Sequence, residues 1–206
     1  MKSSHVLIFA FAGATAAFVY YSLRGGVSPE DYAKEILKER EEKANFLNHG
    51  QGSPFAASDE EFKSLNYYAP ELKYRVTAKL IPVQEKKVTI LPTSDGKEQK
   101  YLDYAHAVFS FEDVENKLLI LEVMEMGSER GKLFLAFADE TSGKETYGGG
   151  RYLDLKKVPA ATTVLLDFNT AYNPYCAYND SYSCPFPPAE NILKIAIKAG
   201  ERIYHK

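Results

Sequence analysis

The sequence lacks the residues and motifs on which most recognisable enzyme chemistry depends. It has no Trp, two Cys and four His among its 206 residues. The His are scattered, and none stands at metal-ligand spacing from another. Zinc-protease, redox dithiol, nucleophile-elbow and dinucleotide-binding motifs are missing. We therefore expect no metal site and no cofactor, and no motif assigns a reaction.

A basic excess is also missing, because the formal net charge is −3. Nucleic-acid binding needs a clustered excess of Lys and Arg, so we expect no nucleic-acid partner. Hydrophobic residues make up 45% of the chain and charged residues 26%, which is typical of a globular protein. Residues 27–206 are of ordinary size for one domain, and we interpret them as a single soluble β-rich domain.

The N-terminus carries an uncharged apolar run from Val6 to Leu23, flanked by Lys2 and Arg24. Its length is near the lower limit for a membrane-spanning helix. We interpret residues 1–26 as a membrane anchor. A cleavable signal peptide is the alternative, with a cleavage site at Ala14-Thr15-Ala16. Both interpretations predict that the following domain leaves the cytoplasm.

Two helices are expected before the strands begin. Ser28 can cap a helix that starts at Pro29 and runs to about Leu47. Ser58 and Glu61 repeat the capping pattern and predict a short helix that ends near Leu65.

From Lys73 onward the apolar residues alternate with a period of two, which is typical of strands. Turn residues separate the apolar runs. The pattern predicts about eight mostly antiparallel strands, within residues 73–83, 86–91, 101–111, 117–126, 132–139, 151–155, 162–168 and 193–198. The fold class is therefore mainly β (α+β), and we expect an antiparallel β-sandwich or a partly open barrel with helices against one side.

The segment between Asp139 and Glu201 is rich in Tyr, Asn, Pro, Gly and acidic residues, and it holds the candidate site. Arg151 follows a triple glycine whose backbone N–H groups could approach an anion or could simply form a bend between strands. The nearby acids can form a buried ion network with Arg151, or they can supply an acid and a base. The candidate site residues are Asp139, Glu145, Arg151, Asp154, Asp167, Asn169, Tyr172 and Asn173.

Two cysteines, Cys176 and Cys184, lie in the same segment with seven residues between them. In an exported domain such a pair is expected to form a disulfide. Closing so short a loop contributes roughly 2–3 kcal/mol. The alternative without a function is a pair of reduced thiols. The functional alternative is a redox pair or a metal site.

Several segments carry a family resemblance, among them SPF (residues 53–55), the region of Phe62 and Leu65, and TSDG (93–96). The strongest are FADETSGKETYGGGRYLDL (residues 137–155), DFNTAYNPYCAYNDSYSCPFPPAEN (167–191) and IKAGE (197–201). They resemble a bacterial family known as a domain of unknown function, number 1684. The resemblance extends over residues 31–201 and implies an exported or membrane-anchored protein, without any catalytic residue to transfer. It favours the bacterial inner membrane as the location, with the domain facing the periplasm or the exterior. A secreted or periplasmic protein, after signal cleavage, is the alternative.

Three functions remain in competition. Tyr-rich and Asn-rich loops on a β scaffold favour a non-catalytic domain that binds a small molecule or a protein in the cell envelope. A hydrolase is the second hypothesis, with Asp139, Glu145 and Asp167 as acid and base and with Arg151 stabilising negative charge. An accessory subunit of a membrane complex, anchored through residues 6–23, is the third.

Overall fold

The computed structural model describes residues 27–56 and 61–205. The predicted membrane segment, residues 6–23, lies outside this part of the chain, and so does Ser58. No helix within the described residues is long and apolar enough to cross a membrane.

The described residues form one α-helix, seven strands and four short 3-10 turns. The helix is α2 (Pro29–His49), and the turns cover Leu72–Tyr74, Phe168–Thr170, Tyr175–Ala177 and Ala189–Asn191. The strands are β1 (Arg75–Pro82), β2 (Val88–Pro92), β3 (Glu98–Phe111), β4 (Val114–Val123), β5 (Leu133–Phe137), β6 (Arg151–Leu155) and β7 (Thr163–Asp167).

Helix α2 begins and ends as its sequence predicts. The Ser28 hydroxyl accepts the backbone N–H of Asp31 at 3.1 Å, and Pro29 occupies the first turn. The helix ends where the backbone N–H of Gly50 donates to the carbonyl of Phe46. One face of α2 is buried against the rest of the domain, through Tyr32, Ile36 and Leu47.

The prediction of a second helix up to Leu65 is wrong for residues 61–65, which are not helical. Tertiary contacts take precedence over the local capping pattern there. The backbone N–H of Lys63 donates to the Tyr204 hydroxyl, so it makes no helical bond. Phe62 and Leu65 pack against a small aromatic cluster built on Phe55.

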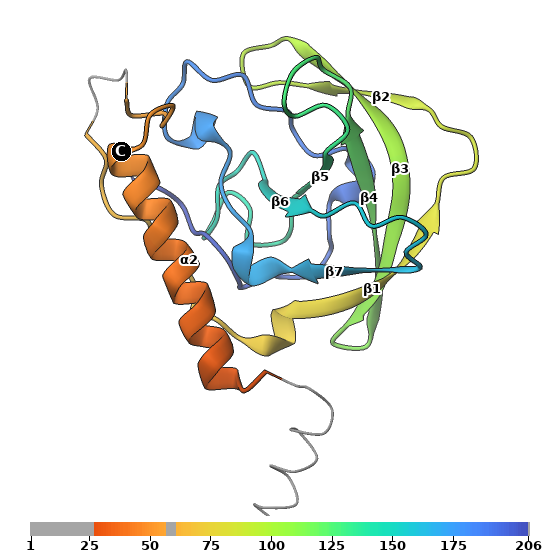
Figure 1. The fold of residues 1–206 in the computed structure, drawn as a ribbon, viewed down its shortest axis with the longest axis horizontal. Helices are drawn as coiled ribbons and strands as arrows, with labels where there is room; N and C mark the ends of the chain where they lie inside the picture. Colours follow the sequence, from red (N-terminus) through yellow and green to blue (C-terminus); the bar gives the residue numbers. More distant parts are fainter. Residues whose placement is uncertain (1–26, 57–60, 206) are drawn as a thin grey trace, which may run out of the picture.

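The strands form one antiparallel sheet in the order β6-β5-β4-β3-β1-β7, and β2 pairs with one end of β3. The long strand β3 carries an irregularity between Asp103 and Ala105, which lets it bend. Figure 1 shows that the sheet curls until its two edge strands, β6 and β7, approach each other. The architecture is therefore a curled half-barrel, which confirms the partly open barrel and excludes the sandwich.

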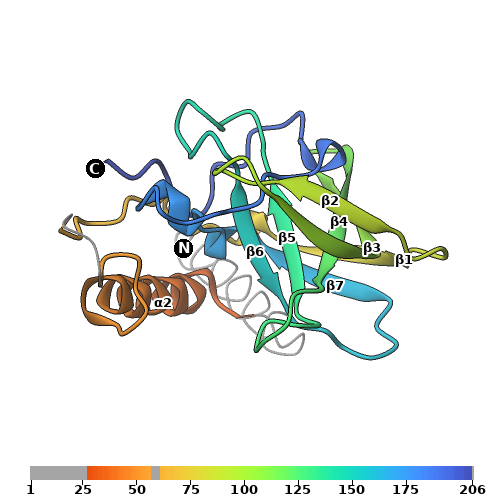
Figure 2. The ribbon, with the colours of Figure 1, turned by 90° about the horizontal axis from the view of Figure 1, so that it is seen from above.

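The interior of the half-barrel holds the main hydrophobic core. Side chains from every strand except β2 meet there with residues of the C-terminal segment, such as Leu193 and Ile197. Ile120 and Leu135 have no solvent exposure, and each such burial stabilises the fold by roughly 1.5–3 kcal/mol. Helix α2 lies at one end of the half-barrel, close to the C-terminus (Figure 2).

The eighth strand predicted at residues 193–198 does not form. The predicted alternation of buried and exposed side chains is present, since Leu193 and Ile197 are buried and Lys194 and Lys198 are exposed. The backbone has other partners than a neighbouring strand. The N–H of Leu193 donates to Ala138 beyond the end of β5, and the carbonyl of Ile197 accepts from the side chain of Arg151.

Candidate functional site

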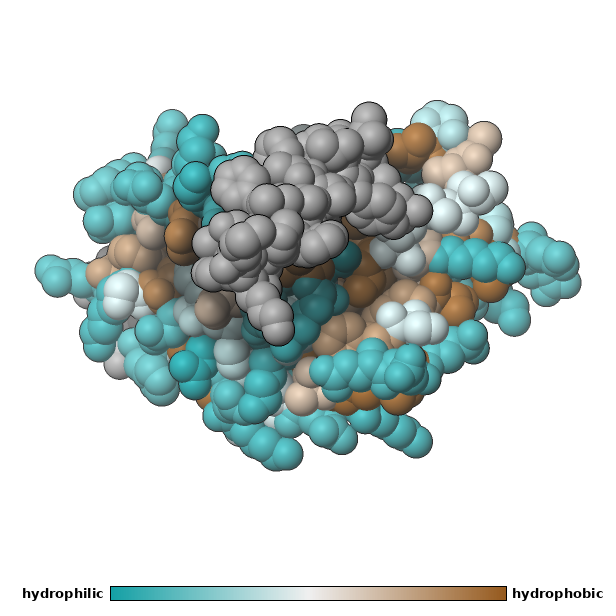
Figure 3. All heavy atoms as spheres, turned by 90° about the horizontal axis from the view of Figure 1, so that it is seen from below, coloured by the Kyte–Doolittle hydropathy of each residue, from teal (hydrophilic) through white to brown (hydrophobic). Residues whose placement is uncertain are grey.

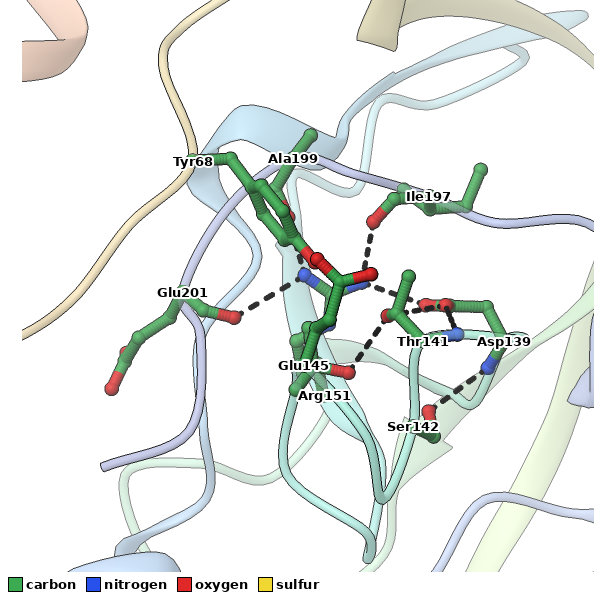
Figure 4. Close-up of polar contacts among 10 residues, drawn as sticks. Tyr68, Asp139, Thr141, Ser142, Glu145, Arg151, Ile197, Ala199 and Glu201 are labelled. Atoms are coloured by element: carbon green, nitrogen blue, oxygen red, sulfur yellow. Dashed lines mark hydrogen bonds and ion pairs between the residues drawn. The ribbon is translucent and has the colours of Figure 1, made fainter. Parts of the chain in front are cut away.

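Arg151, the first residue of β6, is completely buried and forms an ion pair with Asp139, which follows β5. Its Nη2 lies 2.7 Å from Asp139 Oδ2 and donates to the carbonyl of Ile197 at 2.9 Å. Nη1 donates to the carbonyls of Ala199 and Glu201 (Figure 4). The guanidinium thus binds the C-terminal segment to the end of the sheet. Of the two interpretations of Arg151, the structural one fits this burial.

Asp139 also organises the turn that follows it. Its Oδ1 accepts the backbone N–H of Thr141 at 2.7 Å and the Thr141 hydroxyl at 2.5 Å. The Ser142 hydroxyl accepts the backbone N–H of Asp139 (Figure 4). Both carboxylate oxygens of Asp139 are therefore engaged within the protein, which leaves none for an incoming substrate.

Glu145 lies outside the Arg151 pair, at the surface. Its carboxylate accepts from the Tyr68 hydroxyl at 3.1 Å and lies 3.4 Å from Lys198. The hydrogen bond from Tyr68, followed by the contact with Lys198, lowers the pKa of Glu145. The expected cluster of Asp139, Glu145 and Arg151 is thus a buried pair with a separate surface acid.

Asn169 and Asn173 are both buried and hold backbone in place. Asn169 exchanges two hydrogen bonds with the backbone of Glu71, each of 2.9 Å. Asn173 donates to the carboxylate of Glu201, which is completely buried. Glu201 also accepts from Tyr178 and from Lys43, so one carboxylate joins α2 to the C-terminal segment.

Sequence reasoning missed Glu201 as a central polar residue. The signal was present, because Glu201 ends the IKAGE segment that carries the family resemblance. Its partners, Lys43, Asn173 and Tyr178, are far apart in the sequence, so no spacing rule connects them.

The remaining three predicted residues, Asp154, Asp167 and Tyr172, line a cavity of about 570 Å³. The cavity, here called the β6–β7 cavity, is lined by residues of α2 and of the two edge strands, β6 and β7. Its apolar wall comes from five strands, through Leu80, Ile120, Leu133, Leu153 and Val164.

The polar part of the wall is organised by two tyrosine–carboxylate pairs. Tyr32 on α2 donates to both oxygens of Asp167 at 2.7 Å, and Tyr172 donates to Asp154 at 2.8 Å. Arg75 approaches Asp167 at 3.5 Å. Burial, and then the bonded carboxylate, raise the pKa of both tyrosine hydroxyls, which stay protonated at neutral pH.

Helix α2 adds two acids to this wall, Glu35 and Glu39. Partial burial raises the pKa of Glu39, and the neighbouring Glu35 raises it further. Where Figure 3 draws the lower face in colour, hydrophilic residues lie mostly towards the rim and hydrophobic residues are exposed between them.

Cys176 and Cys184 are free, buried thiols in the structure, so the expected disulfide is not confirmed. They are nevertheless neighbours, because the backbone N–H of Cys176 donates to the Cys184 sulfur at 3.2 Å. The hydrogen bond with Cys184 lowers the pKa of Cys176 to about 6, and the Tyr147 hydroxyl lies 3.7 Å from its sulfur. Within the described ranges, no three His, Cys, Asp or Glu side chains gather in a group that could hold a metal ion.

Comparison with known proteins identifies relatives of this chain. A solved structure, the solution NMR structure of an uncharacterized protein from Haloarcula marismortui, is similar, with a TM-score of 0.64 and 35% sequence identity. The match covers 84% of this chain and 95% of that one. The comparison with curated proteins finds no significant match. The model of the family described as "Protein of unknown function (DUF1684)" matches residues 60–202, which is more than half of the chain. The chain therefore belongs to the DUF1684 family.

Proposed function

We propose that this protein is a non-catalytic binding domain whose small-molecule ligand occupies the β6–β7 cavity. The observation that carries the proposal is the wall of this cavity, which combines an apolar floor with charged residues and two fixed tyrosine–carboxylate pairs. Ligand sites typically have this composition and volumes of roughly 300–1,000 Å³. The volume of about 570 Å³ falls within that range.

The arrangement of the acids favours binding over the hydrolase hypothesis. An acid, a base and a cation must converge on one reacting group. Here Arg151 and Asp139 are sealed inside the protein, and Glu145 lies at the surface against Tyr68. Asp167 lies in the cavity wall, bonded to Tyr32. The four residues named for hydrolysis thus occupy three separate places.

A cavity-blocking substitution tests the proposal. Thr162 and Thr163 are both exposed, but only Thr163 lines the β6–β7 cavity, at its rim. The probe is 1-anilinonaphthalene-8-sulfonate, whose fluorescence rises in apolar sites, added to the full-length protein. We expect the dye to bind the wild type and Thr162→Phe alike, and to bind Thr163→Phe at least tenfold more weakly. Equal binding to all three proteins would place the dye elsewhere and refute the cavity as the ligand site.

We further propose that residues 6–23 anchor the protein in the bacterial inner membrane, with the domain facing the periplasm or the exterior. The support is the uncharged apolar run itself. An anchored protein stays in the membrane fraction after extraction at alkaline pH, and a protein released by that treatment would rule out the anchor.

A domain that faces the periplasm or the exterior lies in an oxidising compartment, where disulfides persist. We therefore expect Cys176 and Cys184 to appear in one linked peptide when the protein is mapped without reductant.

A further inference from the structure

A second, smaller cavity of about 100 Å³ adjoins the β6–β7 cavity beneath helix α2. We call it the Arg40 cavity, and it is lined by Arg40 and Lys43 of α2, by Tyr67 and by residues 169–172. The two cavities share four wall residues, namely Ile36, Glu39, Thr170 and Tyr172. The two cavities are therefore neighbours beneath α2.

Two hydrogen-bond donors have no partner among the described residues, and they belong to residues that line both the Arg40 cavity and a neighbouring cavity of about 650 Å³. They are the Nε of Arg40 and the hydroxyl of Tyr67, and both atoms are buried. The other two guanidinium nitrogens of Arg40 already donate to the carbonyls of Tyr68 and Asn169, at 2.8 and 3.2 Å. Buried donors are almost always paired, so this pair calls for an acceptor that the chain itself does not supply.

The positions of the two donors are fixed before any ligand arrives. The Arg40 guanidinium lies 4.3 Å from the centroid of the Tyr67 ring, and its two backbone bonds hold it there. Burial raises the pKa of Tyr67 far above neutral pH, so its hydroxyl keeps its proton and remains a donor. A preorganised donor pair loses little freedom when it binds an acceptor.

The local charge favours a negatively charged acceptor. Within the described residues Arg40 forms no ion pair and donates only to carbonyls, whereas Lys43 in the same wall is already paired with Glu201 at 2.8 Å. The opposing charges are those of Glu39 in the same wall and of Glu201, which pairs with Lys43. One N–H and one O–H can pair with the two oxygens of a carboxylate.

We infer that the ligand is an amphipathic carboxylate, with its apolar body in the β6–β7 cavity and its carboxylate on Arg40 Nε and the Tyr67 hydroxyl. This inference rests on the proposed function, because it names the class of ligand for the same site. It also assigns Tyr67 as a residue that distinguishes a carboxylate from a neutral end group.

The test compares three probes that share one apolar chain: octanoate, 1-octanol and monooctyl phosphate. Affinities for the full-length protein are measured by calorimetry. Octanoate is expected to bind at least tenfold more tightly than the other two. Tyr67→Phe removes the unpaired hydroxyl and keeps the ring beneath Arg40. We expect it to weaken octanoate about tenfold or more and to leave 1-octanol unchanged. Tyr68→Phe is the matched control, because its hydroxyl bonds Glu145 at the surface, and it should change neither affinity.

The possible failures are distinguishable. Equal affinities for octanoate and 1-octanol, both unaffected by Tyr67→Phe, would refute the carboxylate and leave the β6–β7 cavity as an apolar binding site. Tighter binding of monooctyl phosphate would replace the carboxylate by a phosphate. No binding of any probe would contradict the proposed function together with this inference. A lower unfolding midpoint of unliganded Tyr67→Phe would show that the hydroxyl is already paired, by water, and would also overturn the inference.

Discussion

Arg151 donates to four oxygen acceptors of the chain from a position without solvent exposure. A buried charge is tolerated only where it is paired and hydrogen-bonded, and this one meets both conditions through Asp139 and three carbonyls. The pair therefore holds the C-terminal segment against the sheet. Glu201 plays the equivalent part for α2, through Lys43.

Removing the guanidinium should be strongly destabilising. Arg151→Met leaves the Asp139 carboxylate buried without its cation, and we expect it to lower the free energy of unfolding by about 3–5 kcal/mol. Denaturant unfolding measures the change. Lys198→Met is the control, since this side chain pairs with Glu145 at the surface and should change stability by less than about 0.5 kcal/mol. A loss below about 1 kcal/mol for Arg151→Met would contradict the structural interpretation.

The sequence alone supports the Arg151–Asp139 pair as one of two possibilities, because a buried arginine requires an acid nearby. It does not show that Glu145 lies apart from that pair, because Asp139 and Glu145 are only six positions apart in the sequence. The difference arises from the turn after Asp139, which places Glu145 against Tyr68. That contact spans 77 positions in sequence and has no local signature.

At the scale of elements, the triple glycine forms the bend that leads into β6. Gly150 has φ +87°, a conformation that favours glycine, and a Cβ added there would lie 2.7 Å from the Phe137 carbonyl and 2.6 Å from Pro187. Gly148 has no such constraint, because its nearest heavy atom would be 3.6 Å away. The bend interpretation of this segment therefore fits the structure.

These two glycines provide a matched pair of substitutions. Gly150→Ala combines a left-handed backbone with close contacts and should cost about 2–4 kcal/mol of stability. Gly148→Ala should change stability by less than about 0.5 kcal/mol. Thermal or denaturant unfolding of the two variants checks this. Similar effects of both changes would show that the strain at Gly150 is absent in solution.

The strands could be predicted because each is an apolar run, alternating with polar residues in strands such as β1, that stands between turn signals. The run at residues 193–198 alternates in the same way and still forms no strand. Alternation reports which side chains are buried, and Leu193 and Ile197 are indeed buried. It does not report where the backbone bonds go, and there the carbonyl of Ile197 accepts from Arg151.

At the scale of the whole molecule, tyrosine supplies the buried aromatic rings with a hydrogen-bond donor that tryptophan supplies in many domains. It has 15 Tyr and no Trp, and burial raises the pKa of several tyrosines, including Tyr152 and Tyr178. Their hydroxyls donate inside the protein, to the Pro185 carbonyl and to Glu201. The folded state therefore keeps these phenols protonated when the unfolded chain ionises them near pH 10.

Stability should consequently fall at high pH. A group whose folded pKa is raised stabilises the protein fully below its unfolded pKa, and this contribution is lost as the pH rises towards its folded pKa. Each tyrosine as buried as Tyr178 should remove about 1 kcal/mol of unfolding free energy between pH 9 and pH 11. Urea unfolding at both pH values, with tyrosinate absorbance, measures this. Equal stability at pH 9 and pH 11 would contradict the burial of these hydroxyls.

The half-barrel could be anticipated from the strand pattern, but the β6–β7 cavity could not. The cavity exists because a curled sheet stays open between two particular edge strands and because α2 lies beside the opening. The composition of their segment predicts Asp154, Asp167 and Tyr172 as candidate site residues. Their common cavity also depends on Tyr32 and Arg75, which are distant in sequence.

The most direct test of ligand binding in the β6–β7 cavity is a methyl NMR titration of the full-length protein with octanoate. Saturable shifts are expected at cavity methyl groups such as Leu80, Leu153 and Val164, and Thr163→Phe should abolish them. Shifts confined to exposed methyl groups such as Val88 and Ile90, or no saturable shifts at all, would contradict a ligand site between β6 and β7.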